Sequence, residues 1–304
     1  MSDKKILVIG SSNTDMVIKA DRLPLPGETV IGGRFFMNPG GKGANQAIAA
    51  ARLGGKVTLI CKTGNDIFGK QSVELFKSEG INTSYLFSDA KNPSGVALIT
   101  VDANGENCIV VASGANASLS PADIEIARAE VEQSNIVLMQ LEIPIETVEF
   151  AAAMASKKGG RVILNPAPAR TLSEKLLKSL YMITPNKGEA EMLSGIKVTD
   201  WESAKRAADV IRAKGVNIVV VTLGSLGALI AENNKYYQVE AYKVDAVDTT
   251  AAGDTFSGAL CVALSEGKSI VDSVKFAAKA SALTVTKMGA QSSIPHRTEL
   301  SVLD

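Results

Sequence analysis

The stretch Asp248-Thr-Thr-Ala-Ala-Gly-Asp254-Thr-Phe-Ser-Gly-Ala259 places a glycine and a carboxylate at the start of an apolar helix. The amide N–H groups of Ala251, Ala252 and Gly253 are then among the unpaired donors of the helix start, where the helix dipole favours an anion. A carboxylate beside such an anion site suits phosphoryl transfer to an alcohol. It can accept the hydroxyl proton while the amides stabilise the charge of the transferred group. The simpler interpretation of Asp254 is a helix N-cap.

The whole stretch resembles the C-terminal signature of the ribokinase family of carbohydrate kinases. The resemblance covers the acidic residue Asp248, the small-small-Gly-Asp core and the small residues that follow. It implies that Asp254 is a general base in contact with the sugar. It also implies that the amides of residues 251–253 form the anion hole.

A second glycine-rich stretch, Pro39-Gly-Gly41-Lys42-Gly43-Ala-Asn45-Gln-Ala47, precedes a helix of small residues. It is not a P-loop, because Gly43 follows the lysine where Ser or Thr is required, and it lacks the GxGxxG order of a dinucleotide site. It resembles the N-terminal signature of the same family, which binds sugar hydroxyls. The resemblance implies sugar contacts from Gly41, Lys42, Gly43 and Asn45, and a purely structural turn is the alternative.

Polar residues also follow two expected strands. Asn13 and Asp15 lie in a polar turn after the apolar run Ile6–Ile9, and Glu142 follows the run Ile136–Leu141. Ligands of open α/β sheets collect at such strand ends. Turn residues that bond their own backbone are the alternative. In the resembled family, matching side chains hold sugar hydroxyls.

Apolar runs alternate with helical segments over most of the chain, which predicts an α/β fold. We expect a mainly parallel central sheet with helices on both faces, in one ribokinase-like domain over residues 1–304. Further strands are expected at Val162–Leu164, Met182–Ile183 and Ile218–Leu223.

Two β-rich segments, at about residues 14–38 and 94–112, interrupt this alternation. The second contains Asp102-Ala-Asn-Gly105, a strong hairpin signal. We expect the two segments to form a small sheet that stands off the core. In the resembled family this sheet is a lid over the sugar and often the dimer contact, which implies a homodimer through the lid.

Nucleotide and Mg²⁺ contacts are implied by two further clusters. The strand at Ile218–Leu223 leads into a glycine-containing loop that resembles the nucleotide loop of the family. The spacing of Asn186 and Glu189 corresponds to the asparagine and glutamate that order Mg²⁺ through water, although a helix cap has the same pattern. The implied ATP contacts are Asn186, Thr222, Gly224, Ser225, Gly227 and Gly253. Many family members carry Asn at the position of Ala278, so base recognition here is expected to rest on packing.

A monovalent-cation site, for K⁺, is implied by the resemblance alone. In the family, the loop that corresponds to residues 284–293 supplies oxygen ligands, and acidic and threonine residues complete the site from the other side. The matching residues are Asp248, Thr250, Thr284, Lys287, Gly289 and Ser293.

The composition excludes several other classes of protein. Of 304 residues, Lys plus Arg and Asp plus Glu number 32 each, and no basic stripe indicates a nucleic-acid or membrane partner. Cys61, Cys108 and Cys261 form no CxxC pair, which favours a reducing compartment. The first apolar run is too short for a signal peptide, so a cytoplasmic location is expected. The only histidine, His296, is expected at the surface.

The expected activity is ATP-dependent phosphorylation of D-ribose at its 5-hydroxyl, with MgATP and K⁺. A kinase of the same family acting on deoxyribose, fructose or a nucleoside would use the same base and anion hole. A non-catalytic sugar or nucleotide sensor is a further alternative, which the intact Gly253-Asp254 pair disfavours. A Rossmann dehydrogenase is disfavoured by the missing GxGxxG.

Overall fold

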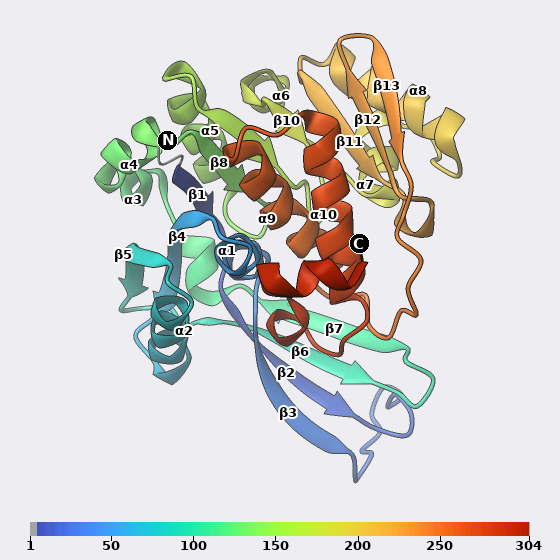
Figure 1. The fold of residues 1–304 in the computed structure, drawn as a ribbon. Coiled ribbons are helices and arrows are strands. Elements are labelled where there is room, and N and C mark those ends of the chain that lie inside the picture. The colour runs from blue at the N-terminus through green and yellow to red at the C-terminus, as the bar shows by residue number, and fades with distance from the viewer. Residues whose placement is uncertain (1–4, 304) are drawn as a thin grey trace.

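The computed structural model describes residues 5–303 and contains two β-sheets (Figure 1). In sheet order, the strands of the nine-stranded sheet are β13 (Lys235–Val239), β12 (Ala228–Glu232), β11 (Ile218–Thr222), β10 (Met182–Ile183), β9 (Arg161–Leu164), β8 (Ile136–Met139), β1 (Lys5–Ile9), β4 (Lys56–Gly64) and β5 (Asn82–Asp89). From β11 to β5 all neighbours are parallel, and the hairpin β12–β13 adds an antiparallel edge. The predicted mainly parallel sheet is confirmed, whereas β5 was not predicted.

Helices cover both faces of this sheet, as predicted (Figure 1). On one face lie α1 (Lys42–Arg52), α2 (Ile67–Ser78), α9 (Ala252–Ser265) and α10 (Ile270–Thr284). On the other lie α3 (Pro121–Ile126), α4 (Arg128–Gln133), α5 (Ile145–Lys157), α6 (Glu174–Ser179), α7 (Lys187–Ser194) and α8 (Trp201–Ala213).

Strand β1 shows why this sheet forms the core. Ile6 and Val8 pack into the cluster that contains α1 and α9, while Leu7 and Ile9 pack into the opposite cluster. All four side chains are fully buried, and burying such a side chain contributes about 1.5–3 kcal/mol. Continuous apolar runs are the pattern of strands covered on both faces.

The small sheet has four strands in the order β3 (Arg34–Gly40), β2 (Asn13–Lys19), β6 (Gly95–Val101) and β7 (Asn107–Ala112). It projects from one end of the molecule, at the lower edge of Figure 1. The expected polar turn at residues 11–15 is wrong in part, because Asn13 already pairs with Gly40 and Gly95 in β2. Since side chains alternate along a strand, Asn13 and Asp15 share one face of the small sheet.

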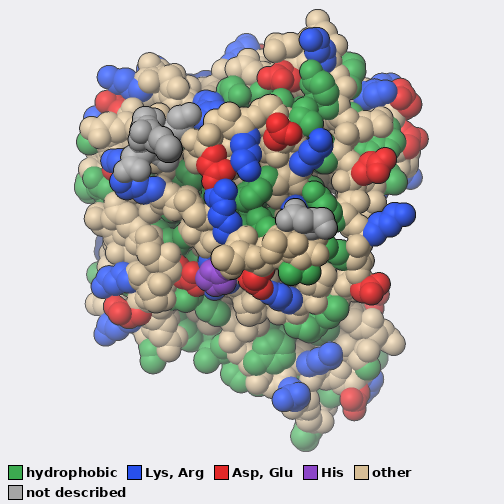
Figure 2. All heavy atoms as spheres, viewed as in Figure 1, with side chains coloured by type: hydrophobic (Ala, Val, Ile, Leu, Met, Phe, Trp, Pro, Cys, Tyr) green, Lys and Arg blue, Asp and Glu red, His purple; other side chains and the backbone are tan. Residues whose placement is uncertain are grey.

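The surface carries charges of both signs. Figure 2 shows Lys and Arg interspersed with Asp and Glu on one face of the molecule. No helix within residues 5–303 is long and apolar enough to cross a membrane. His296 is exposed, as expected, and Cys61 and Cys261 are buried, while Cys108 is exposed.

Candidate active site

Asp254 lies in the first turn of α9. The helix follows Ala251, which adopts the left-handed conformation with φ of 60°, and no side chain caps it. The amide of Ala252 donates to the carbonyl of Thr249 at 3.3 Å, whereas helical geometry leaves the amides of Gly253 and Asp254 without an intrahelical acceptor. The positive end of a helix dipole therefore lies directly beside a carboxylate.

The Asp254 carboxylate does not cap its own helix. Its Oδ2 accepts a hydrogen bond from Asn45 Nδ2 at 2.9 Å, and its Oδ1 accepts one from Gln46 Nε2 at 2.9 Å. The N-cap interpretation is therefore wrong. Gln46 was not predicted as a site residue, and the only signal for it was its place in the glycine-rich stretch directly after Asn45.

The electrostatic environment of Asp254 combines burial with a nearby cation. Burial raises the pKa of Asp254, which is 7% exposed, while the charge of Lys42 and the two amide donors oppose the rise. Burial would lower the pKa of Lys42, but surrounding carboxylates outweigh it and raise that pKa. These carboxylates are Asp254, Glu142, Glu189 and Asp15.

Asp15 faces the same region from the small sheet. Its carboxylate lies against Gly40, where a Cβ atom would come within 2.3 Å of Asp15 Oδ2. Burial and then the charge of Glu142 raise the pKa of Asp15 to about 6, although Lys42 opposes the shift. The Asp15 side chain is therefore ionised above about pH 6 and accepts hydrogen bonds from hydroxyl groups there. Below that pH it is protonated and loses acceptor capacity.

Glu142 joins the end of β1 to the start of α1. Its Oε2 accepts the Ser11 hydroxyl at 2.5 Å and the backbone amide of Lys42 at 3.0 Å. The structure thus brings Asp15, Lys42, Glu142 and Asp254 into one region, as predicted from separate parts of the sequence.

Asn116 is a further site residue that the sequence did not reveal. Its Nδ2 donates to Asn13 Oδ1 at 2.7 Å and to the Ser12 carbonyl at 3.1 Å. Gly95 makes room for both asparagines, because a Cβ atom there would lie 2.2 Å from Asn13 Oδ1. The Asn13 oxygen accepts the bond from Asn116, which fixes the orientation of the Asn13 amide and leaves its NH₂ group to donate elsewhere.

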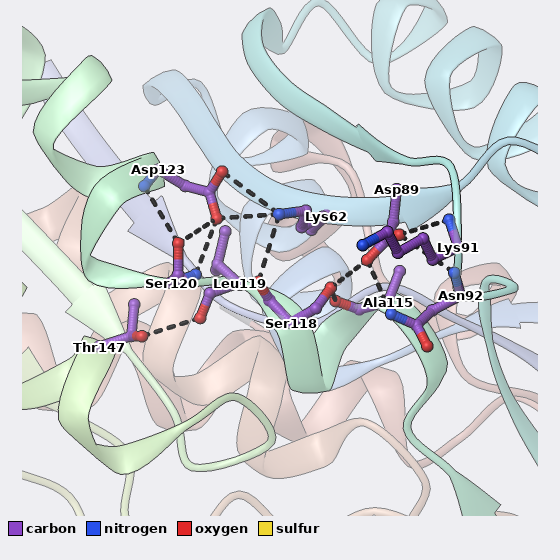
Figure 3. Close-up of polar contacts among 10 residues, drawn as sticks. All are labelled: Lys62, Asp89, Lys91, Asn92, Ala115, Ser118, Leu119, Ser120, Asp123 and Thr147. Atoms are coloured by element: carbon purple, nitrogen blue, oxygen red, sulfur yellow. Dashed lines mark hydrogen bonds and ion pairs between the residues drawn. The ribbon is translucent and has the colours of Figure 1, made fainter.

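A polar network anchors the short 3₁₀ helix that carries Asn116, η1 (Gly114–Ser118) (Figure 3). Lys62 Nζ on β4 donates to the Ser118 carbonyl at 3.2 Å and to Asp123 Oδ2 at 3.0 Å. The Ser118 hydroxyl also donates to Asp89, at the end of β5. Two strands of the core sheet and α3 therefore fix η1, and η1 in turn fixes Asn13.

The glycines of the stretch before α1 serve close packing. Gly41 has φ of 89°, and a Cβ atom there would lie 2.7 Å from the backbone nitrogen of Asn13. A Cβ atom on Gly43 would lie 2.5 Å from the backbone nitrogen of Ser11. Glycine at these positions brings α1 against the ends of β1 and β2, and Gly43 packs against Gly10 and Ser11, directly after β1.

A cavity of about 800 Å³ opens on the other side of the α9 start. All six residues that were predicted to contact ATP line it: Asn186, Thr222, Gly224, Ser225, Gly227 and Gly253. Apolar side chains, Val244, Ala246, Ala278, Ala282 and Val285 among them, also line it. Its size and mixed lining are those of a site for a nucleotide-sized ligand.

Asn186 and Glu189 form a capping box at the start of α7. Asn186 Oδ1 accepts the amide of Glu189 at 2.9 Å, and Glu189 Oε2 accepts the amide of Asn186 at 2.8 Å. Burial raises the pKa of Glu189, although the bond from Asn186 and the charge of Lys42 oppose the rise. The helix cap that the spacing predicts as an alternative is therefore present. The Glu189 carboxylate also interacts electrostatically with Lys42 and Asp254.

Two residues of the expected cation site, Thr250 and Gly289, contact Asp248. Asp248 Oδ1 accepts the Thr250 hydroxyl at 2.6 Å, and Asp248 Oδ2 accepts the amide of Gly289 at 2.9 Å. Burial opposes the shift, but these bonds lower the pKa of Asp248. The loop boundary was predicted wrongly at Thr284, which lies within α10 and donates its hydroxyl to the Thr255 hydroxyl at 3.0 Å.

The other two side chains of that loop bond within the protein. Ser293 donates its hydroxyl to the Ala290 carbonyl at 2.7 Å, and Lys287 forms an ion pair with Glu299 at 2.5 Å. The Lys287 ammonium group cannot be a cation ligand, whereas the Ser293 hydroxyl oxygen keeps its lone pairs and, with backbone carbonyl oxygens and Asp248, is suited to a cation.

A buried carboxylate between a cluster of polar side chains and a nucleotide-sized cavity, next to a helix start, is the arrangement of a small-molecule kinase site. The family model described as pfkB family carbohydrate kinase matches residues 3–297. The chain therefore belongs to the pfkB family of carbohydrate kinases, and the resemblance inferred from the two signature stretches is confirmed.

Individual relatives agree with this assignment. The chain is 46% identical to a ribokinase of Haemophilus influenzae over 296 residues, which are 97% of either chain. It is 39% identical to a deoxyribokinase of Salmonella typhi over 291 residues, 95% of either chain. A solved structure of Arabidopsis thaliana ribokinase complexed with ribose and ATP superposes with a TM-score of 0.91 at 34% identity, covering 99% of this chain and 98% of the other.

Proposed function

We propose that this protein is an ATP-dependent kinase that phosphorylates D-ribose at its 5-hydroxyl, giving ribose 5-phosphate and ADP. The observation that carries the proposal is Asp254. Its carboxylate is held by two amide donors between a cluster of charged and polar side chains and a nucleotide-sized cavity. The identity to a curated ribokinase supports ribose as the acceptor.

In this proposal the Asp254 carboxylate accepts the proton of the ribose 5-hydroxyl while the oxygen of that hydroxyl attacks the γ-phosphorus of ATP. The new O5–P bond forms while the bond from the γ-phosphorus to the bridging oxygen breaks, and ADP leaves. The backbone amides at the start of α9, which were expected to be those of residues 251–253, stabilise the charge of the transferred group. The structure favours Gly253 and Asp254 as these donors, because the Ala252 amide already bonds to Thr249.

The sugar hydroxyls are proposed to bind to Asn13, Asp15, Lys42 and Glu142. Asn13 presents a donor and Asp15 an acceptor on one face of the small sheet, while Lys42 supplies the positive charge. Gly41 and Gly43 support these contacts by close packing. Asn45 remains a sugar contact in the proposal, although its Nδ2 already binds Asp254.

ATP is proposed to occupy the 800 Å³ cavity, with Mg²⁺ held through water by Asn186 and Glu189. A carboxylate and an amide oxygen suit this hard cation, which retains most of its own water ligands. When bound, Mg²⁺ neutralises charge on the phosphate groups. The apolar lining at Ala278 suggests that packing holds the base.

A K⁺ ion is proposed beside Asp248, with carbonyl oxygens of the loop up to residue 293 as further ligands. The donor set fits, because only oxygen atoms are offered and the pKa of Asp248 is lowered by its hydrogen bonds. When bound, the ion would stabilise the turn before α9 that precedes the anion hole.

We further propose a homodimer through the small sheet. The face opposite Asp15 and Asn13 carries exposed apolar side chains: Ile18, Phe35, Met37, Leu98 and Val110. A contiguous apolar surface of this kind is typical of an interface between protein chains.

Deoxyribose is the second candidate acceptor, because a deoxyribokinase is nearly as similar as several ribokinases. The proposal is tested by measuring ADP formation from MgATP with ribose, deoxyribose, fructose and adenosine, each in K⁺ and in Na⁺ buffer. We expect the highest kcat/KM with ribose and a higher rate in K⁺. Preference for another acceptor would refute ribose and retain the kinase, whereas no turnover with any acceptor would favour a sensor.

A further inference from the structure

A chain of buried amide side chains surrounds the Asp254 carboxylate. The two direct donors, Asn45 and Gln46, are 6% and 0% exposed, and each has a further amide partner. These partners are Gln140, Asn165 and Gln291, all at most 7% exposed. They come from the end of β8, the segment after β9 and the C-terminal loop, so three distant parts of the chain meet at the proposed base.

The orientation of Gln46 is fixed on every side. Its Nε2 donates to Asp254 Oδ1 at 2.9 Å and to Asn165 Oδ1 at 3.0 Å, while its Oε1 accepts Gln140 Nε2 at 2.5 Å. An amide nitrogen has two protons to donate, and both are used. Gln140 Oε1 is buried without a partner, so this acceptor is left unpaired at a free-energy cost.

The orientation of Asn45 depends on Gln291. Gln291 Nε2 donates to Asn45 Oδ1 at 3.0 Å, which leaves Asn45 Nδ2 to face Asp254. Arg52 holds Gln291 in place, because its Nη1 donates to the Gln291 carbonyl at 2.7 Å and to the Ile294 carbonyl at 2.9 Å. Gln291 Oε1 is also buried and unpaired.

We propose that Gln46 and Gln291 are positioning residues that hold Asp254 as an ionised acceptor. The inference rests on the proposed role of Asp254 as the base. Both neighbours of the carboxylate are donors, so a proton on Asp254 would have no acceptor among them, whereas the ionised form has two hydrogen bonds. The network thus favours the form that can accept a proton from the substrate and fixes the direction of the carboxylate.

Other charged groups near Asp254 also affect the equilibrium between its ionised and protonated forms. They are Lys42 on α1, Glu142 after β8, Glu189 on α7 and Asp15 on β2. Lys42 favours the ionised form, and the carboxylates oppose it. None of the variants below changes these four residues, and Gln46→Met and Gln291→Met add no charge, so a shift in the titration of Asp254 in these two variants is attributable to the amides.

The test uses the full chain with Gln46→Met, Gln291→Met and Gln291→Glu. We expect Gln46→Met to lower kcat by about 10- to 100-fold and to move the acid limb of the kcat profile, measured at saturating ribose, to higher pH, with an unchanged KM for MgATP. A purely structural role would leave the acid limb where it is in the wild type.

The two Gln291 variants separate orientation from packing. At a pH above the acid limb, where Asp254 and the carboxylate at position 291 are both ionised, a packing role predicts the milder loss of kcat for Gln291→Glu, because Glu is closer in shape to Gln than Met is. In the proposed role the order is reversed. A carboxylate at position 291 accepts Asn45 Nδ2, turns the amide and points Asn45 Oδ1 at Asp254. A smaller loss of kcat in Gln291→Glu than in Gln291→Met would overturn the inference, and so would an unmoved acid limb in Gln46→Met.

The titration of Asp254 provides a readout that needs no substrate. In protein labelled with ¹³C at the aspartate carboxyl groups, the Asp254 signal is assigned from its loss in Asp254→Asn. We expect a higher pKa of this carboxyl in Gln46→Met than in the wild type, and an equal pKa would refute the network. If the wild type phosphorylates no acceptor, the proposed function fails while this titration still decides the inference. If Gln46→Met does not fold in a urea-unfolding control, Gln291→Met decides it, again with a higher pKa of the Asp254 carboxyl expected than in the wild type.

Discussion

At Asp254, two amide donors and a helix start surround one carboxylate. Asn45 and Gln46 each donate one hydrogen bond to this carboxylate, which in the proposed mechanism accepts the proton of the sugar hydroxyl. The sequence predicted Asp254, because its signature stretch is local. Gln46, Asn116 and Gln291 were not predicted, since their partners lie 208, 103 and 246 positions away in the chain.

The pH dependence of ribose binding is expected to follow Asp15. Its pKa is raised to about 6, so lowering the pH through 6 protonates the carboxylate and removes acceptor capacity for hydroxyl groups. The KM for ribose is therefore expected to rise below about pH 6, by roughly 10-fold per pH unit at most. Steady-state kinetics from pH 5 to 8 measure this, with Asp15→Asn as the comparison. A KM for ribose that rises equally in the variant would contradict the assignment.

At the scale of elements, close approach of α1 to the ends of β1 and β2 creates the side of the site where the sugar is proposed to bind. Gly41→Ala places a Cβ atom 2.7 Å from the Asn13 backbone at a φ of 89°. We expect a loss of at least about 2 kcal/mol in the free energy of unfolding and a higher KM for ribose. Urea unfolding and kinetics measure the two effects.

Gly80→Ala is the matched control for Gly41→Ala. Gly80 also has positive φ, 72°, but a Cβ atom there meets no atom within 4 Å. We expect only the conformational cost of about 1–2 kcal/mol and an unchanged KM for ribose. Equal effects of the two substitutions on KM would show that the contact at Gly41 does not shape the site.

The elements themselves could largely be predicted, because apolar runs such as Ile6–Ile9 specify strands buried on both faces. Strand β5 could not, since Asn-Thr-Ser-Tyr-Leu-Phe-Ser-Asp mixes polar and apolar residues at an edge of the sheet. The anchoring of η1 by Lys62 and Asp89 also could not be foreseen, because it depends on how β4 and β5 pair (Figure 3).

At the scale of the whole molecule, the small sheet leaves an apolar face exposed. Val110 on this face is 68% exposed, and Ile126 on α3, outside the small sheet, is 70% exposed. We expect a dimer for the wild type and for Ile126→Glu, but a monomer for Val110→Glu, because a charge at the interface would have to be desolvated. Analytical ultracentrifugation measures the oligomeric state of the wild type and of both variants. A monomeric wild type, or a dimeric Val110→Glu, would contradict dimer formation through this sheet.

The account as a whole depends on proton transfer to Asp254 during ribose phosphorylation. The most direct test follows ribose and MgATP by ³¹P NMR with the wild type and with Asp254→Asn, after calorimetry has established that both bind ribose. We expect ribose 5-phosphate as the only sugar phosphate from the wild type, and a rate lower by roughly 10²- to 10⁴-fold in the variant. Phosphate on another oxygen, or a near-normal rate in Asp254→Asn, would contradict the account.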